Sequence, residues 1–311
     1  MSEIGGEQYK HAKSLAVSFV YGIPFPKGPL QRQELKKKLH ELSPDVIHCH
    51  DSRSMGAVPL SRTYRILETR RVSYPIKWIS RWRKYRKANF HVGVSREIES
   101  YLKHYFNNVG FVSSCTEIEK LPDDCHSPLQ QSANHNILFV GALDNQKGVD
   151  ILVRAFAGIL KQFPDSLLHI VGTGSLLKPL LRLTADLELS RHVIFYGERQ
   201  RVTAFYRFCT VLAVPSVAGE GSSGVIREGL ACAIPVIASD LTANREIIDE
   251  NQTGYFSITG DVDSLEKRLI EFLRGDLPFD PRAALRRAAD FSCARMTDKY
   301  VSIYKHILKR Q

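Results

Sequence analysis

The sequence predicts an α/β protein of two domains, the second of them a doubly wound sheet. Strand-like apolar runs alternate with amphipathic helical stretches over most of the 311 residues, which is typical of parallel sheets covered by helices. A polar, proline-bearing and unpatterned stretch at residues 122–136 separates two such series. The chain is also long enough for two cores. We expect domains at residues 1–132 and 133–294, with a C-terminal helix at about 295–311 that packs back on the first domain.

The first series begins with an amphipathic helix and continues with short apolar runs. Ser95 stands where a cap residue would begin the second helix. Helices are expected at residues 30–42 and 96–106, and strands at 43–51, 89–95 and 109–113.

The second series is more regular, and its first helix has apolar residues spaced by three and four. Strands are expected at residues 136–143, 166–174, 192–198, 210–216 and 235–239, and helices at 149–163, 176–189, 201–209 and 224–233; residues 241–249 close the series. In a doubly wound sheet, ligands collect at the carboxyl ends of the strands.

Composition and cysteine spacing favour a soluble protein of a reducing compartment. No segment approaches the ~20 apolar residues of a membrane span, and the first residues lack an apolar signal region. Six cysteines, at positions 49, 115, 125, 209, 232 and 293, include no CxxC pair. We therefore expect a cytoplasmic protein with free thiols and no zinc cluster or disulfide framework.

The formal net charge of +10 is concentrated in one segment. Residues 62–87 hold seven Arg and three Lys against one Glu, with Trp and Tyr residues interleaved. A solvated basic helix is one interpretation, and attachment to anionic lipid headgroups or to an anionic acceptor is another. Nucleic-acid binding is a weaker alternative because no recognition motif accompanies the charge, and we expect no nucleic-acid partner.

The stretch VPSVAGEGSSGVIREGLA reads as a strand, a loop of small residues and a helix. Backbone N–H groups at Ser222, Ser223 and Gly224, together with the start of the helix, suit a diphosphate. Glu228 is better suited to accept hydrogen bonds from vicinal hydroxyls, as a ribose offers them, and Glu220 to do the same for a sugar. The pattern therefore predicts a site for a nucleotide sugar.

These residues resemble the family 4 (group 1) glycosyltransferases of the GT-B fold, which has two Rossmann-like domains facing a cleft. Glu220 and Glu228 match the family's Glu-x7-Glu spacing. The stretches LACAIPVIASDLTANREIIDENQTGYF and FVGALDNQKGVDILVRAF match its neighbouring elements, and the resemblance covers about 175 residues, from 137 onward. As a block, these motifs are far more specific than any one of them alone.

The resemblance implies a role for each matching position. Glu228 would bind the donor ribose, Glu220 would orient the transferred sugar, and Lys147 would stabilise the diphosphate leaving group. Catalytic candidates are Glu220, Lys147 and His50. Donor-binding candidates are Gly141, Lys147, Gly197, Arg199, Glu220, Ser222, Ser223, Gly224, Val225 and Glu228. Neither a cofactor nor a metal is expected.

Some positions depart from the family pattern. Ala142 stands where many relatives carry an Arg that shares the diphosphate with Lys147. Either Lys147 and the amides of Ser222–Gly224 suffice, or another basic residue, Arg227 or Arg199, supplies that charge. Arg70 stands where relatives place a histidine, which leaves His50 and its neighbour Asp51 as candidates; strand packing is the alternative for His48 and His50. The first strand of the first domain is expected to be absent or shortened.

We expect a retaining hexosyl-type glycosyltransferase that uses a nucleoside diphosphate sugar and a hydroxyl of a cell-surface glycan or lipid-linked saccharide. The protein would be cytoplasmic, with residues 62–87 holding it at the inner face of the membrane. A non-catalytic GT-B relative that binds a nucleotide sugar or a partner protein is the alternative. Gly172 and Gly174 match part of a dinucleotide motif, but a strand–helix turn explains them better.

Overall fold

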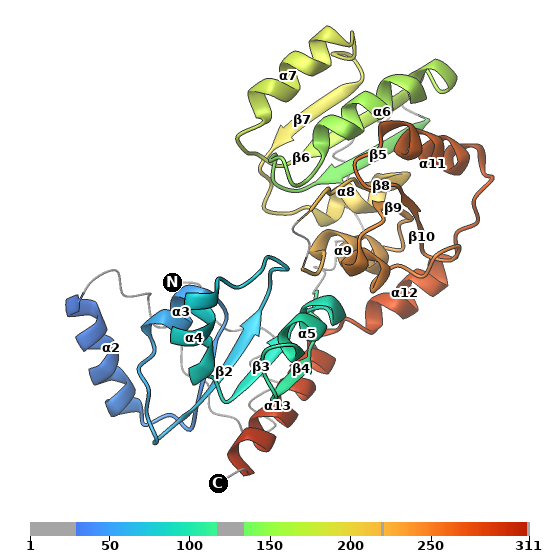
Figure 1. The fold of residues 1–311 in the computed structure, drawn as a ribbon. Helices are drawn as coiled ribbons and strands as arrows, with labels where there is room; N and C mark the ends of the chain where they lie inside the picture. Colours follow the sequence, from blue (N-terminus) through green and yellow to red (C-terminus); the bar gives the residue numbers. More distant parts are fainter. Residues whose placement is uncertain (1–28, 117–133, 219–220, 310–311) are drawn as a thin grey trace. The chain divides into compact units, whose positions relative to one another are not determined.

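The structure is a computed structural model that describes residues 29–116, 134–218 and 221–309. It divides into two units: residues 1–115 with 292–311 (unit 1), and residues 116–291 (unit 2). Each unit contains a parallel sheet with helices around it (Figure 1). The predicted boundary at 132/133 and the predicted shortening of the first strand lie outside the described residues. The chain returns to unit 1 at 291/292.

Unit 1 is built on a four-stranded parallel sheet of order β1-β2-β3-β4. Its strands are β1 (Val46–Cys49), β2 (Arg65–Arg70), β3 (Phe90–Gly93) and β4 (Val109–Phe111). Its helices before the crossing are α2 (Pro29–Leu42), α3 (Ser52–Ala57), α4 (Trp78–Arg83), η1 (Tyr85–Lys87) and α5 (Arg96–Lys103). The strands and helices expected in this part are present, and Ser95 caps α5 by accepting a hydrogen bond from Ile98 N.

The interpretation of residues 62–87 as one solvated basic helix is wrong. Residues 65–70 form strand β2 inside the sheet, and only residues 78–83 form an α-helix. Glu68 and Thr69 are buried in this strand because their polar atoms have partners. Glu68 Oε2 lies 3.1 Å from His91 Nδ1, and Thr69 Oγ1 lies 3.0 Å from Tyr300 Oη. The exposed cations of the segment are therefore spread over α4, η1 and the loops beside β2; they are Arg62, Arg71, Lys77, Arg83 and Arg86.

Helix α13 (Cys293–Lys309) packs on the sheet of unit 1 (Figure 1). Its buried Tyr300 and Ile307 contact Leu67 and Val92 of the central strands. Two of its hydroxyls also reach polar groups of the sheet, and one of these contacts joins Tyr304 Oη to His48 Nδ1 at 2.7 Å. The last helix is therefore an integral part of unit 1.

Unit 2 has a six-stranded parallel sheet of order β10-β9-β8-β5-β6-β7. Its strands are β5 (His135–Val140), β6 (Ser166–Val171), β7 (Val193–Gly197), β8 (Val211–Val214), β9 (Val236–Ser239) and β10 (Gly254–Ser257). Its helices are α6 (Val149–Gln162), α7 (Leu177–Asp186), α8 (Thr203–Phe208), α9 (Gly224–Ala231), α10 (Thr242–Arg245), α11 (Val262–Arg274) and α12 (Pro281–Ala289). The order reverses between β5 and β8, which makes this a doubly wound sheet.

Two apolar clusters cover the two faces of this sheet. One includes Phe156 of α6 and Leu269 of α11, and the other includes Ile226 and Leu230 of α9. The predicted elements of unit 2 are confirmed, but β10, α11 and α12 were not predicted. None of the described helices is long and apolar enough to cross a membrane.

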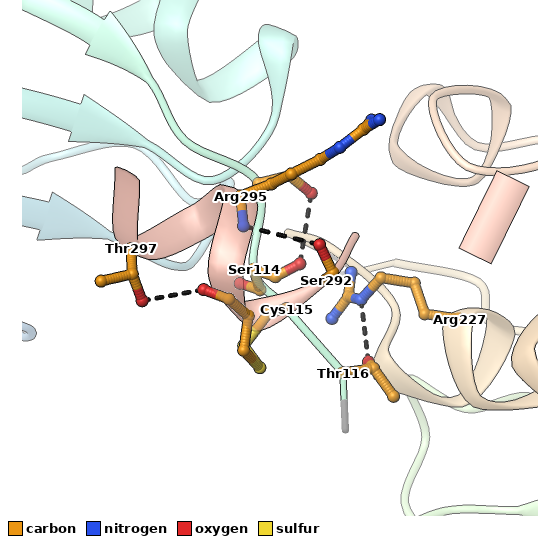
Figure 2. The surroundings of a disulfide bond; sticks show 9 residues. Ser114, Cys115, Thr116, Arg227, Ser292, Arg295 and Thr297 are labelled. Atoms are coloured by element: carbon orange, nitrogen blue, oxygen red, sulfur yellow. Dashed lines mark hydrogen bonds between the residues drawn. A yellow bond between two sulfur atoms is a disulfide. The ribbon is translucent and has the colours of Figure 1, made fainter. Parts of the chain in front are cut away.

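The prediction of free thiols is wrong for two of the six cysteines. Cys115 and Cys293 form a disulfide with Cα atoms 4.9 Å apart (Figure 2). They are 178 positions apart in the sequence, so no local spacing indicated the pair. Folding brings them together because both lie where the chain passes between the two units.

His169 is a buried titratable group in the middle of unit 2. It lies in β6, and its ring nitrogens have partners on both sides: Nδ1 lies 2.9 Å from Tyr196 Oη and Nε2 lies 2.8 Å from Asn136 Oδ1. Burial lowers the pKa of this imidazole to about 4. The folded protein therefore holds His169 in its neutral form at neutral pH.

This depressed pKa makes the stability of the protein depend on pH. The unfolded chain protonates His169 near its ordinary pKa of 6.5, whereas the folded chain does so only near 4. The stability that comes from keeping His169 neutral is therefore fully present above about pH 6.5 and is lost as the pH falls towards 4. The loss in the free energy of unfolding reaches about 3 kcal/mol. Urea unfolding at about pH 7 and about pH 4.5 measures the effect. The difference should shrink in His169→Gln; an unchanged difference would contradict the assignment.

Candidate functional site

The loop between β8 and α9 leads into the N-terminus of α9. The N-cap residue there, Ser223, makes no side-chain hydrogen bond to the helix. Ser223 has extended backbone angles and is buried, but its hydroxyl caps no N–H group of α9. The first N–H groups of an α-helix lack partners within the helix, and they carry the positive end of the helix dipole. This end of α9 can therefore bind an anion, as the sequence predicts for Ser222, Ser223 and Gly224.

Two charged side chains of α9 fold back towards the same helix start. A Cβ atom placed on Gly224 would lie 3.8 Å from Arg227 Nη2 and 3.9 Å from Glu228 Oε1. Arg227 is 3% exposed, and its Nη1 donates a hydrogen bond to Ser222 Oγ. The guanidinium and the carboxylate therefore lie beside each other at the mouth of the amide-lined loop. A cation there favours an anionic ligand, and the carboxylate favours hydroxyl donors.

Tyr206 of α8 fixes one oxygen of the Glu228 carboxylate by a hydrogen bond. Its hydroxyl donates a 2.6 Å hydrogen bond to Glu228 Oε2, and its side chain is buried in α8. Burial and the neighbouring Glu228 raise the pKa of this phenol well above 10, so it stays protonated and donates. Sequence reasoning missed Tyr206 because it lies 22 positions from Glu228 on a different helix.

The loop that carries Lys147 packs directly on the β8–α9 loop. Val217 N donates a 2.8 Å hydrogen bond to Gln146 O. Gly148 has φ +61°, and a Cβ atom placed on it would lie 2.2 Å from Pro215 O. Only glycine allows this approach of the two backbones. The structure therefore brings the loop of Lys147, a partly buried residue, beside the loop of Ser222.

Gly141 and Gly197 lie at the same edge of the sheet. Gly172 N donates to Gly197 O at 2.9 Å, and a Cβ atom on Gly172 would lie 1.8 Å from Gly141 O. The turn interpretation of Gly172 and Gly174 is thus confirmed, since the close approach of two loops requires glycine there. Arg199 follows β7 and is exposed, and its Nη1 donates to Glu198 O at 3.3 Å.

The remaining predicted residues fall elsewhere. Glu220 lies outside the described residues, and Val225 is a partly buried residue of α9 that packs on the core of unit 2. His50 belongs to unit 1, at the carboxyl end of β1. Desolvation by the surrounding protein, followed by the charge of Arg71, lowers the pKa of His50 to about 4, although the residue is exposed.

The neighbours of His50 have structural roles. Asp51 caps α3 by accepting a 2.6 Å hydrogen bond from Ser54 N. His48 fills a position between the sheet and α13, with Nε2 2.7 Å from Thr69 Oγ1, so the strand-packing interpretation is confirmed for it. Arg70 is buried at the end of β2, and its Nε has no hydrogen-bond partner.

In the part of the chain that the structure describes, no three His, Cys, Asp or Glu side chains form a group that could hold a metal ion. The donor set around α9 combines one carboxylate with a guanidinium, amides and hydroxyls. The expectation of a metal-free site stays a prediction.

Comparisons with known proteins identify relatives of the chain. Residues 127–290 match the family model described as glycosyl transferases group 1. The chain is 33% identical over 144 residues to a phosphatidyl-myo-inositol mannosyltransferase of Mycobacterium leprae, which covers 45% of this chain and 38% of that protein. It is 27% identical over 267 residues to the mannosyltransferase of the same name from Mycolicibacterium smegmatis, covering 80% of this chain and 67% of that protein.

The fold is shared with solved GT-B structures. The Anabaena protein HepE, solved in complex with UDP, superposes with a TM-score of 0.77 at 17% identity, covering 89% of this chain and 82% of that one. The two-unit α/β architecture is therefore the GT-B fold, as the sequence predicts. The chain spans only 38% of the length of the first mannosyltransferase named above.

The contact between Gly148 and Pro215 can be tested by substitution. Gly148→Ala places a Cβ atom against Pro215 O in a left-handed backbone, so we expect a loss of about 2 kcal/mol or more in the free energy of unfolding. Gly260→Ala is the matched control, because Gly260 has φ +82° and no atom within 4 Å of the added Cβ. It should lose only about 1 kcal/mol. If urea unfolding gave the same loss of free energy for Gly148→Ala and Gly260→Ala, the close contact between Gly148 and Pro215 O would be contradicted.

Proposed function

Because the chain belongs to the group 1 glycosyl transferase family, we propose that it transfers a hexose from a nucleoside diphosphate sugar to a hydroxyl with retention of configuration. The acceptor in this proposal is a cell-surface glycan or a lipid-linked saccharide. The names of its mannosyltransferase relatives, which refer to phosphatidyl-myo-inositol, support a lipid-linked acceptor. The bound UDP of the Anabaena structure supports a nucleotide donor.

The observation that carries the proposal is the arrangement at the start of α9. The amide-lined loop and Arg227 form an anion site, and Glu228 lies beside it with one oxygen fixed by Tyr206. A diphosphate would bind the N–H groups, and the ribose hydroxyls would donate to Glu228. Arg227 would supply the positive charge that relatives take from the position of Ala142. Arg227 is better placed than Arg199 to contact the diphosphate, because Arg227 bonds to Ser222 of the loop, whereas Arg199 follows β7.

In this proposal, catalysis depends on stabilising the leaving diphosphate. Negative charge grows on the phosphate as the glycosidic bond breaks, so fixed cations and amides lower the barrier more than they strengthen ground-state binding. Lys147 and the amides of the β8–α9 loop would supply this stabilisation. Glu220 would orient the transferred sugar, and His50, neutral at physiological pH, would serve the acceptor side.

Donor hydrolysis tests the activity. The enzyme should release nucleoside diphosphate slowly from one member of a panel of UDP-, GDP-, ADP- and CMP-sugars without any acceptor. The same donor should raise the melting temperature. Stabilisation without release would favour the alternative, a non-catalytic nucleotide-sugar-binding protein. NMR analysis of the anomeric configuration of the product would test retention.

Substitutions at Glu228 and Lys147 should separate donor binding from turnover. Glu228→Ala removes charge-assisted acceptors of the ribose hydroxyls, so donor binding should weaken by roughly 1.5–3 kcal/mol. Lys147→Ala should lower kcat more than donor affinity. Lys161→Ala, at an exposed lysine in the last turn of α6, is the control and should change neither. Unchanged donor affinity in Glu228→Ala or unchanged kcat in Lys147→Ala would rule out the corresponding role.

Helix α4 supports the proposal that the protein attaches to the inner face of the membrane. Trp78 and Trp82 are 71% and 65% exposed, one helical turn apart. Arg81 lies 4.0 Å from the ring centre of Tyr105. Together with Arg86, these residues line a cavity of about 430 Å³. Indole rings beside cations favour the headgroup region of an anionic bilayer.

Vesicle co-sedimentation tests this attachment. Replacing Arg81, Arg83 and Arg86 by Gln should weaken binding to anionic vesicles by roughly 1 kcal/mol per cation and reduce its salt dependence. Trp78→Ser with Trp82→Ser should weaken it without changing the salt dependence. Lys178→Gln with Arg182→Gln, which removes exposed cations of α7 in unit 2, is the matched control. Equal binding by all of these variants would refute the attachment.

A further inference from the structure

The two places where the chain passes between the units are joined covalently. Cys115 is the last residue of unit 1 before the chain enters unit 2. The chain returns to unit 1 at Ser292, and Cys293 is the next residue. Their disulfide, whose surroundings are drawn in Figure 2, closes a loop that contains all of unit 2. Closing so long a loop removes much conformational freedom from the chain.

The crossing segments also pair directly beyond the disulfide. Thr116, which follows Cys115, donates its backbone N–H to Phe291 O at 3.1 Å. This hydrogen bond lies one residue from Cys115 and two from Cys293, so the disulfide limits how far its two partners can separate. We call Thr116 and Phe291, with the bond between them, the base of unit 2.

Arg227 links this base to the loop at the start of α9. Its Nε donates a 3.1 Å hydrogen bond to Thr116 Oγ1, as Figure 2 shows, and its guanidinium lies 5.9 Å from the ring centre of Phe291. Its Nη1 donates to Ser222 Oγ. One buried side chain therefore contacts both crossing segments and the candidate donor loop.

The other described thiols are poorly suited to redox chemistry. Cys49, Cys209 and Cys232 are unpaired, and burial raises the pKa of each thiol, to about 11 for Cys49 and Cys232. They stay protonated near neutral pH, and a thiol reacts with a disulfide only as its thiolate. Cys293 is buried, but Cys115 is only partly buried, so Cys115 is the side of the pair at which an exchange reagent would react.

We propose that Cys115 and Cys293 form a reversible disulfide, and that Arg227 is a positioning residue that transmits the state of this pair to the donor loop at residues 221–223. The effect on donor binding rests on the function proposed above. Oxidation proceeds by exchange with a low-molecular-weight disulfide such as oxidised glutathione. The two protein thiols give up two electrons and two protons, one S–S bond forms, and the reagent leaves as two thiols.

The physical consequence follows from the contacts of Arg227. With the disulfide closed, Thr116 and Phe291 stay paired and hold the guanidinium beside Ser222. Reduction frees the crossing segments to separate, so Arg227 loses a fixed anchor and the loop becomes less ordered. A less ordered loop must be ordered again when a donor binds, which lowers the affinity. Oxidised protein should therefore bind the donor more tightly.

The experiment compares oxidised and reduced full-length protein. Peptide mapping should find the Cys115–Cys293 cross-link after treatment with oxidised glutathione and lose it after dithiothreitol. Hydrogen exchange in the peptide around Ser222 should be slower in the oxidised form. Donor affinity, measured by calorimetry with the sugar nucleotide that gives the largest thermal shift, should be on the order of fivefold tighter in that form.

Variants identify the residues responsible. Cys115→Ser with Cys293→Ser should behave as the reduced form under both conditions, whereas Cys232→Ser should respond as the wild type does. Arg227→Met should keep the cross-link but lose the redox dependence of exchange at Ser222, and Arg227→Lys should restore part of it. If the serine variant does not fold, reduction of the wild type gives the same comparison.

Two outcomes would overturn the proposal: no cross-link under oxidising conditions, or equal exchange around Ser222 in the oxidised and reduced forms. If hydrogen exchange around Ser222 still depended on the redox state in Arg227→Met, Arg227 would not be the residue that links the disulfide to the donor loop. Redox-dependent exchange without any nucleotide-sugar binding would leave the coupling intact and refute the proposed function instead. The hydrogen-exchange readout needs no donor, so the two failures can be distinguished.

Discussion

The arrangement of the candidate site depends on the pairing of β5 with β8 in the centre of the unit 2 sheet. Two parallel neighbouring strands end at the same edge, so the loops that follow them must share the space there. Gly148 allows these loops to touch, because any side chain at that position would overlap Pro215 O. The lysine loop and the amide-lined loop are brought together by sheet topology, although they are about 75 residues apart in the sequence.

Within this edge, charge is arranged to suit a ligand with both anionic and hydroxyl groups. A carboxylate beside an anion site is unfavourable unless its charge is offset. Arg227 directly precedes Glu228 on α9 and folds towards the same helix start, while Tyr206 donates to one oxygen of Glu228. Tyr206 fixes Oε2 of the carboxylate, and Glu228 Oε1 lies beside Gly224. A site for phosphate alone would have no need of the carboxylate, and this is the reason for which a nucleotide sugar is the proposed ligand.

The sequence was most informative where periodicity was strong. The alternating strands and helices of unit 2 and the position of the small-residue loop before α9 were predictable, because apolar spacing and glycine content are local signals. Strand β10 was missed because its four residues give little periodicity. The assignment of residues 65–70 to a basic helix was wrong because this strand carries Glu68, Thr69 and Arg70, which are typical of a surface segment. The strand is buried because Glu68 and Thr69 have hydrogen-bond partners on β3 and α13, which the sequence does not show.

The features that local reasoning could not reach are contacts between distant residues. Tyr206, Thr116 and Cys293 carry no motif, and each gains its role only from what the fold places beside it. The cysteines show this most clearly, since the absence of CxxC spacing argued for free thiols. Local spacing is informative for metal clusters, whose ligands are often close in sequence. It says nothing of a bond between chain crossings, since the two ends of a domain inserted in another are often close together in space, however far apart they are in the sequence. In a protein of this topology, cysteines that flank the inserted domain are therefore candidates for a disulfide whatever their separation.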